Sequence, residues 1–132
     1  MHIGLLEDDL AIQEMLCLVL QSEGYGVVIY STAEDCLTDL LTAERGPSAT
    51  RLDLLIVDLR LPRSVSGTEV ISQLRADLRW RSLPIILTTA SSYTNIGELE
   101  QLQVTLVTKP FDIDEMVRII RELTQPQLPT QR

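Results

Sequence analysis

The sequence is short of histidine, cysteine and positive charge. Its 132 residues include one histidine and two cysteines, and 11 basic residues stand against 19 acidic ones, giving a net charge of -8. Sequence-independent binding to nucleic acid depends on Lys and Arg to neutralise phosphates, so this balance argues against it. The charge favours solubility, and a basic partner or a cation. Cys17 and Cys36 have no metal-ligand spacing and no cysteine-rich context. We therefore expect two free thiols in a reducing compartment.

Long apolar runs are also missing. No run approaches the ~20 residues that span a bilayer, and the first apolar stretch, 3–6, is only four residues long before three acids follow. We expect no signal peptide, no membrane-spanning segment and a cytoplasmic location. The 45% apolar content is ample for one core, so we predict a single domain over residues 1–124. Residues 125–132, polar with two prolines, predict a flexible C-terminal tail or the start of a linker.

Short apolar runs alternate with amphipathic stretches along the chain. The runs predict five strands, at 2–6, 26–30, 54–58, 84–89 and 105–108. The central runs are apolar on both sides, as a parallel sheet covered on both faces requires. The stretches between them have helical period, and only the pattern between Ser91 and Gln103 is weak, so we expect a short or mobile helix there. The alternation predicts an α/β fold with a doubly wound, five-stranded parallel sheet.

Local signals predict where the helices begin and end. The first helix has an apolar stripe and should end at Gly24, and Asp9 has a structural or capping role at its start. The stripe consists of Ile12, Met15, Leu16, Val19 and Leu20. Three later helices should start at pairs with capping-box spacing. These pairs are Ser31 with Glu34, Ser66 with Glu69, and Asp112 with Glu115.

Acidic and polar residues fall where the predicted strands end. Glu7 and Asp8 follow the first strand, Asp58 ends the third, Thr89 ends the fourth and Lys109 follows the fifth. In an open doubly wound sheet, ligands bind outside the carboxyl ends of the strands, where the strand order reverses. We therefore expect these five residues to meet in one crevice. Three carboxylates so close repel one another unless a cation lies between them.

The residue types in this crevice suit phosphate chemistry. An all-oxygen anionic site selects hard cations, Mg²⁺ above all. Lys109 and the Thr89 hydroxyl supply an ammonium and a neutral donor for a phosphoryl group. Thr88 is the rival donor, and we prefer Thr89 because the small Ala90 follows it. The carboxylate of Asp58 could then attack phosphorus in line and carry the phosphoryl group as an acyl phosphate.

These motifs, in this order, resemble the receiver domain of two-component response regulators, the CheY-like family. They are Glu7-Asp8, Asp58, Thr89-Ala90 and Lys109-Pro110-Phe111. The likeness covers residues 2–124 and implies a flavodoxin-like (βα)5 fold with strand order 2-1-3-4-5. It also implies that Asp58 takes a phosphoryl group from a sensor histidine kinase or a histidine phosphotransfer protein. The protein would be a switch that turns over no external substrate, and so not an enzyme.

The resemblance assigns further roles at the crevice. It implies Mg²⁺ held by Glu7, Asp8, Asp58 and the backbone carbonyl of Arg60, with Asp8 as the direct ligand and Glu7 acting mainly through water. Thr89 would bond one phosphoryl oxygen of phosphorylated Asp58, and Lys109 would pair with another. The Lys109-Pro110 peptide would be cis, which only an X-Pro bond adopts at modest cost.

The resemblance also implies how the protein passes on a signal, and the sequence departs from the family pattern at two places. It implies a downstream protein partner bound through the fourth helix, fifth strand and fifth helix, with no direct binding of nucleic acid or membrane, and it leaves homodimerisation open. Leu106 stands where the family often has an aromatic ring that moves on activation. The loop that follows Pro62 carries one residue more than usual before Gly67.

Three other functions compete with this interpretation. A Mg²⁺-dependent phosphatase of the haloacid-dehalogenase type needs an Asp two residues after its nucleophile, and this chain has Arg60 there. A flavodoxin-like cofactor binder needs a Gly/Ser/Thr-rich phosphate loop after the first strand, where 7–11 read EDDLA. A pseudo-receiver that only docks to partners stays open, although the intact acids, Thr89 and Lys109 disfavour it.

Overall fold

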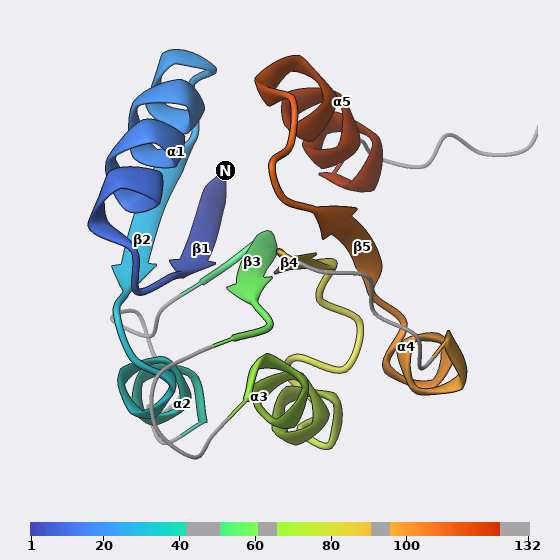
Figure 1. Cartoon of the computed structure of the whole chain (residues 1–132). Helices are drawn as coiled ribbons and strands as arrows, with labels where there is room; N and C mark the ends of the chain where they lie inside the picture. Colours follow the sequence, from blue (N-terminus) through green and yellow to red (C-terminus); the bar gives the residue numbers. More distant parts are fainter. Residues whose placement is uncertain (42–50, 61–65, 91–95, 125–132) are drawn as a thin grey trace, which may run out of the picture.

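Five parallel strands form one sheet with the order β2-β1-β3-β4-β5. The computed structural model describes residues 1–41, 51–60, 66–90 and 96–124 (Figure 1). The strands are β1 (His2–Leu6), β2 (Gly26–Tyr30), β3 (Leu54–Asp58), β4 (Ile85–Thr89) and β5 (Thr105–Thr108). The helices are α1 (Leu10–Ser22), α2 (Ala33–Leu41), α3 (Gly67–Arg75), α4 (Ile96–Leu102) and α5 (Ile113–Thr124). The predicted α/β fold, the strand order and the short fourth helix are therefore confirmed, and the predicted tail lies outside the described residues.

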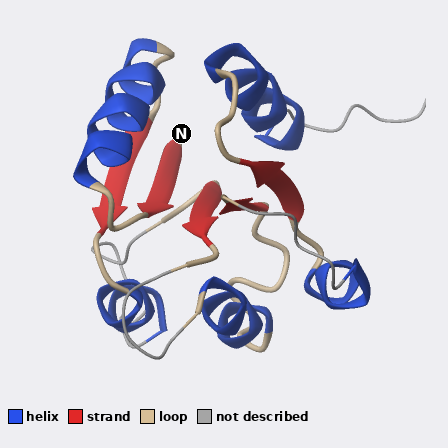
Figure 2. Cartoon of the chain, viewed as in Figure 1, coloured by secondary structure: helices blue, strands red, loops and turns tan. Residues whose placement is uncertain are grey.

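Two layers of helices cover the two faces of the sheet. Helices α1 and α5 lie on one face, and α2, α3 and α4 lie on the other (Figures 1 and 2). Each layer closes over its own apolar cluster. One cluster joins α1 and α5 to the sheet through residues such as Leu16, Met116 and Ile56. The other joins α2 and α3 to it through residues such as Leu40 and Val57.

Strand β3 is the rigid centre of this arrangement. All five of its residues are buried, and its side chains alternate between the two clusters, with Leu54 and Ile56 on one face and Leu55 and Val57 on the other. Burial of each such side chain stabilises the fold by roughly 1.5–3 kcal/mol. The strand ends at Asp58, which pairs in register with Thr88 of β4. The apolar run thus fixes where this carboxylate lies.

Some of the helix ends lie where the sequence signals predicted them. The Asp9 carboxylate caps α1 by accepting from the N–H groups of Ala11 and Ile12, and Gly24 follows the helix with a φ of 92°, a conformation that glycine adopts at low cost. Both predictions are confirmed.

The other caps show one correction. Ser66 caps α3 by accepting from the N–H of Glu69, and the Asp112 carboxylate accepts from the N–H of Asp114 at the start of α5. At α2, however, the side chain that accepts from Asp35 N–H is Thr32. The prediction of Ser31 as the cap was wrong by one residue, because Ser31 instead accepts from a buried amide of α1.

The apolar stripe of α1 also needs correction. Leu16 and Leu20 are buried as predicted, but Met15 is 37% exposed, whereas Gln13 is only 6% exposed. Gln13 lies three residues before Leu16 and seven before Leu20, so it shares their face of the helix. A polar side chain therefore occupies the inner face of α1 next to the end of β1.

Arg75, the last residue of α3, joins the end of that helix to the segment that follows it and to the end of α4. Its guanidinium donates to the backbone carbonyls of Trp80, Arg81 and Leu83 after α3, and to those of Leu102 and Gln103 at the end of α4. Burial lowers the pKa of this guanidinium. The carbonyls satisfy its donors and tie the turn between α4 and β5 to α3.

None of the helices in the described ranges is long and apolar enough to cross a lipid bilayer.

Candidate functional site

The carboxyl ends of β1 and β3 bring three acids together. One carboxylate oxygen each from Glu7, Asp8 and Asp58 lie within 4.8 Å of one another. β1 and β3 are neighbouring parallel strands, so residues that follow their ends share one edge of the sheet. Glu7 and Asp58 are only 2% and 7% exposed, whereas Asp8 is exposed. The cluster therefore has a buried floor and an open side.

Lys109 reaches this cluster from the end of β5. Its Nζ lies 2.9 Å from Oε1 of Glu7 and 3.4 Å from Oδ2 of Asp58. Its backbone N–H donates to the carbonyl of Thr89 at 2.6 Å, which joins the ends of β4 and β5. The peptide bond to Pro110 is cis, as predicted. One cation thus bridges two buried carboxylates.

Backbone N–H groups fix the orientation of the same carboxylates. The N–H of Arg60 donates to Oδ1 of Asp58 at 3.2 Å, and the N–H of Asp9 donates to Oε2 of Glu7 at 3.2 Å. Each carboxylate therefore holds Lys109 with one oxygen and a backbone donor with the other. The side chain of Arg60 is exposed.

The cluster carries more negative than positive charge, and its pKa values reflect this. Burial raises the pKa of Glu7 to about 7, and the charge of Asp58 adds to the effect while Lys109 opposes it. Burial also acts to lower the pKa of Lys109, but its contacts with Glu7 and Asp58 outweigh burial and raise that pKa. Both shifts mean that the cluster favours an additional positive charge, as a proton or as a metal ion.

The two threonines at the end of β4 differ in their surroundings. Thr88 is 2% exposed and its hydroxyl donates to the carbonyl of Val57 at 3.4 Å. Thr89 is fully buried, and its backbone faces Thr108 of β5 in register. Thr88 is therefore engaged with the strand that carries Asp58, and Thr89 stays our predicted hydroxyl donor for a phosphoryl oxygen.

Gly67 allows α3 to start directly beneath the acceptor position. Its N–H donates to the carbonyl of Leu59 at 3.1 Å. A Cβ at residue 67 would lie 2.5 Å from the backbone carbonyl oxygen of Asp58 and 3.0 Å from Cα of Leu59. Only a residue without a side chain fits here, so the glycine is required by this close approach.

Some features singled out in the sequence lie outside the described residues or away from the acidic cluster. Pro62 and most of the loop before Gly67 lie outside the described residues. Leu106, at the position of the family's aromatic ring, is half-buried and packs against the apolar cluster under α2 and α3.

The donor set fits Mg²⁺. Three carboxylates that approach closely in a half-buried cleft offer only oxygen ligands, which hard divalent cations prefer. A divalent ion would also favour the charged form of Glu7, whose pKa is raised by burial and further by the charge of Asp58. Glu7, Asp8 and Asp58 are therefore the residues able to hold a metal ion here.

Gln13 belongs to the site, and sequence reasoning missed it. Its Nε2 donates to the backbone carbonyl of Glu7 and, at 3.2 Å, to Oγ of Ser31. The signal was present: a polar amide spaced three and seven residues from Leu16 and Leu20, on a helix face that is otherwise apolar.

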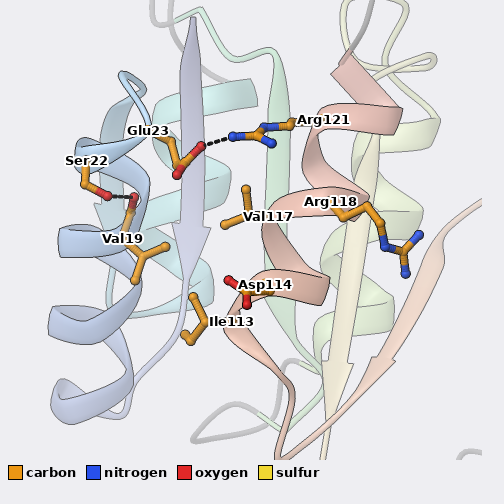
Figure 3. Close-up of a pocket in the computed structure, with 8 residues that line it drawn as sticks. All are labelled: Val19, Ser22, Glu23, Ile113, Asp114, Val117, Arg118 and Arg121. Atoms are coloured by element: carbon orange, nitrogen blue, oxygen red, sulfur yellow. Dashed lines mark hydrogen bonds and ion pairs between the residues drawn. The ribbon is translucent and has the colours of Figure 1, made fainter.

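Of the hollows that border α1 in the described residues, two also touch residues that follow β5. One of about 420 Å³ adjoins the site and is lined by Ile12, Met15, Ala90, Lys109, Pro110 and Phe111. The other, of about 430 Å³, lies between α1 and α5 (Figure 3). Its arginines are already paired within the chain, Arg121 with Glu23 and Arg118 with Glu115 and Glu122. The second hollow is therefore a poorer candidate for a phosphate site than the acidic cluster with Lys109.

Comparisons with known proteins point to one family. The family model described as the response regulator receiver domain matches residues 3–121. Response regulator ArlR of Staphylococcus aureus is 32% identical over 128 residues, which cover 96% of this chain and 53% of ArlR. The chain thus spans about half the length of the curated relatives it matches.

Solved structures agree with this chain in fold. The crystal structure of response regulator protein TrrA from Thermotoga maritima, in complex with Mg(2+)-BeF, matches with a TM-score of 0.75 and 28% identity over 92% of this chain and 97% of that chain. The phosphorylated cyanobacterial phytochrome response regulator RcpA matches with a TM-score of 0.77 and 25% identity over 98% of each chain.

Proposed function

The chain belongs to the family of response regulator receiver domains, and from this premise we propose that Asp58 is its phospho-acceptor and Mg²⁺ its metal. The observation that carries the proposal is the cluster itself: Asp58 ends the buried central strand with two further acids and Lys109 around it. Receiver domains are phosphoacceptor switches. The protein therefore takes a phosphoryl group onto itself and turns over no external substrate.

The transfer forms one bond and breaks one. A carboxylate oxygen of Asp58 attacks the phosphorus of a phosphohistidine, and the bond between phosphorus and the donor's imidazole nitrogen breaks. The nitrogen keeps the electron pair, so no proton need leave Asp58, which reacts as the carboxylate. The product is an acyl phosphate on Asp58. The donor is a sensor histidine kinase or a histidine phosphotransfer protein.

The neighbouring residues stabilise the charge that the phosphoryl group brings. Lys109, now paired with Glu7 and Asp58, is placed to pair with a phosphoryl oxygen, and the Thr89 hydroxyl bonds another. Glu7, Asp8, Asp58 and the backbone carbonyl of Arg60 hold Mg²⁺. The bound metal supplies charge neutralisation between the acids and the phosphoryl oxygens.

The consequence of phosphorylation is a change in partner binding. The modified Asp58 draws Lys109 and Thr89 toward its phosphoryl oxygens. Thr89 ends β4 and Lys109 follows β5, so both lie at the connections to α4 and α5. A downstream protein partner reads the altered surface, in a cytoplasmic setting where kinase and regulator meet. The domain covers residues 1–124.

Beryllofluoride tests this proposal because it forms an acyl-phosphate mimic only on a reactive carboxylate. We expect Mg²⁺ with beryllofluoride to raise the unfolding temperature of the wild type above the value with Mg²⁺ alone, through ligand linkage. Asp58→Asn should show no such additional rise. Equal rises in the two proteins, or none in the wild type, would contradict the proposal, and the latter would favour a docking module that is never phosphorylated.

A further inference from the structure

Gln13 is a buried polar side chain near the acids that the proposed chemistry does not use. It is 6% exposed and lies on the inner face of α1. A buried amide is costly unless its groups are hydrogen-bonded. A leucine at this position would pack with Leu16 and Leu20 without that requirement, so the amide calls for a specific explanation.

The contacts of Gln13 connect three segments at the site. Its side-chain Nε2 donates to the backbone carbonyl of Glu7 at the end of β1 and to Oγ of Ser31 after β2. Its own backbone N–H donates to the carbonyl of Asp9 at 2.9 Å, in the first turn of α1. The carbonyl of Glu7 can only accept, so the amide must present its nitrogen there. One side chain of α1 thus links the turn after β1, which carries Glu7 and Asp8, to the residue that follows β2.

Glu7 is consequently held at four points. Its backbone N–H donates to the carbonyl of Tyr30 at 3.2 Å, its backbone carbonyl accepts from Gln13, and its two carboxylate oxygens accept from Asp9 N–H and Lys109 Nζ. Two of these contacts come from backbone groups, of Tyr30 and Asp9, and a third comes from the side chain of Lys109. Gln13 supplies the remaining one, and it does so from a different element.

We propose that Gln13 is a positioning residue for the metal ligands: by holding the carbonyl of Glu7, it fixes the turn after β1 so that the carboxylates of Glu7 and Asp8 converge toward Asp58. The inference rests on the proposed function, because it assigns a role toward the Mg²⁺ that the acids would bind. Residues that orient metal ligands by hydrogen bonds commonly contribute 10-fold to 100-fold, roughly, to metal affinity. Gln13 touches neither the metal nor the phosphoryl group.

Calorimetric titration with Mg²⁺ on the unphosphorylated full chain tests this role without depending on activity. Gln13→Met keeps the length of the side chain and removes the donor. We expect its dissociation constant for Mg²⁺ to rise roughly tenfold or more, with the rate of phosphorylation restored when Mg²⁺ is raised to saturation. Gln21→Met is the matched control, since the same replacement on the exposed side of the same helix should leave Mg²⁺ affinity unchanged.

The outcomes separate this inference from the function on which it rests. If the wild type binds Mg²⁺ and Gln13→Met binds it equally well, the positioning role is wrong and the proposed function stands. If the wild type itself binds no Mg²⁺, the proposed metal site fails, and this inference fails with it. If Gln13→Met does not fold, Gln13→Asn decides: it keeps the amide but draws it back from the Glu7 carbonyl by one methylene, so we expect a similar rise in the dissociation constant, and an unchanged value overturns the proposal.

Discussion

Lys109 Nζ lies 2.9 Å from Oε1 of Glu7, across 102 positions of sequence, and this ion pair sits beside the proposed acceptor Asp58. The lysine pairs with two of the three carboxylates that would hold a metal ion. The site is therefore held together before any ligand arrives, and ligands must displace or redirect contacts that already exist.

Replacing Lys109 should separate metal binding from phosphorylation. In Lys109→Gln the ammonium that competes for Glu7 and Asp58 is gone, so Mg²⁺ affinity should stay the same or increase. The phosphoryl oxygens lose a charged partner, so phosphorylation by acetyl phosphate should slow on the order of 100-fold. Titration calorimetry and the rate of mass gain measure the two effects. A large loss of Mg²⁺ affinity in this variant would contradict the account.

Mg²⁺ binding should depend on pH through Glu7. With a pKa near 7 against an ordinary value of 4.5, Glu7 is protonated in the metal-free protein below neutral pH, and the metal requires the carboxylate form. Affinity should therefore fall about tenfold for each pH unit below the pKa and level off above it. Titrations between pH 5 and 8, roughly spanning this pKa, measure the slope.

Glu7→Gln is the control for that pH dependence. It removes the titrating group and keeps the size of the side chain, so the affinity for Mg²⁺ should be lower but nearly flat over the same pH range. An equally steep slope in Glu7→Gln would assign the titration to another group and would contradict the raised pKa of Glu7.

Gly67→Ala should damage both stability and the site. The added methyl group would meet the carbonyl oxygen of Asp58 at 2.5 Å, so α3 or the end of β3 must shift. We expect a loss of about 1–3 kcal/mol in the free energy of unfolding in urea, together with slower phosphorylation. Ser66→Ala loses the helix cap and the contact with the Thr68 hydroxyl, about 1 kcal/mol, and should leave phosphorylation intact. Equal phosphorylation rates in wild type and Gly67→Ala would argue against the close approach.

Arg75 should prove a structural residue far from the chemistry. Its guanidinium donates to five backbone carbonyls, and Arg75→Met would leave these acceptors without that donor. We expect a loss of about 2–4 kcal/mol in unfolding free energy, and little change in Mg²⁺ affinity. Arg81→Met, at an exposed position of the same segment, should be nearly neutral. Similar stabilities for the two variants would show that the carbonyl contacts are unimportant.

The two cysteines should differ in reactivity. Cys36 is fully buried, and burial raises the pKa of its thiol to about 12, whereas Cys17 is only half-buried. The thiolate is the reactive form, so at pH 8 iodoacetamide should modify Cys17 first and Cys36 only after unfolding. Peptide mass mapping distinguishes them. Modification of Cys36 in the folded protein at the rate of Cys17 would be the contrary result.

Much of the fold could be predicted because the pattern is local. The run before Asp58 is apolar at every position, which fits only a strand covered on both faces, and the predicted range 54–58 is the observed β3. The end residues Glu7, Asp58 and Lys109 could be placed together because parallel strands share one edge.

The errors arose where tertiary contacts decide between similar residues. Ser31 and Thr32 are both good caps, and only the position of Gln13 shows that Ser31 is engaged elsewhere. Gln13 and Arg75 look like surface residues in the sequence, since long polar side chains usually face solvent. The role of Arg75 depends in part on the carbonyls of Leu102 and Gln103, far along the chain, and that of Gln13 on the Glu7 carbonyl and the Ser31 hydroxyl, so both roles follow from tertiary contacts.

The most direct test of the account is the intact mass of the protein after incubation with acetyl phosphate. Wild type with Mg²⁺ should gain the mass of one phosphoryl group, and should gain none when the metal is chelated. Asp58→Asn should gain none under either condition. Asp53→Asn, altered just before the opposite end of the same strand, should behave as the wild type. A gain that persists in Asp58→Asn, or no gain in the wild type with any phosphodonor, would contradict the assignment of Asp58 as the phospho-acceptor.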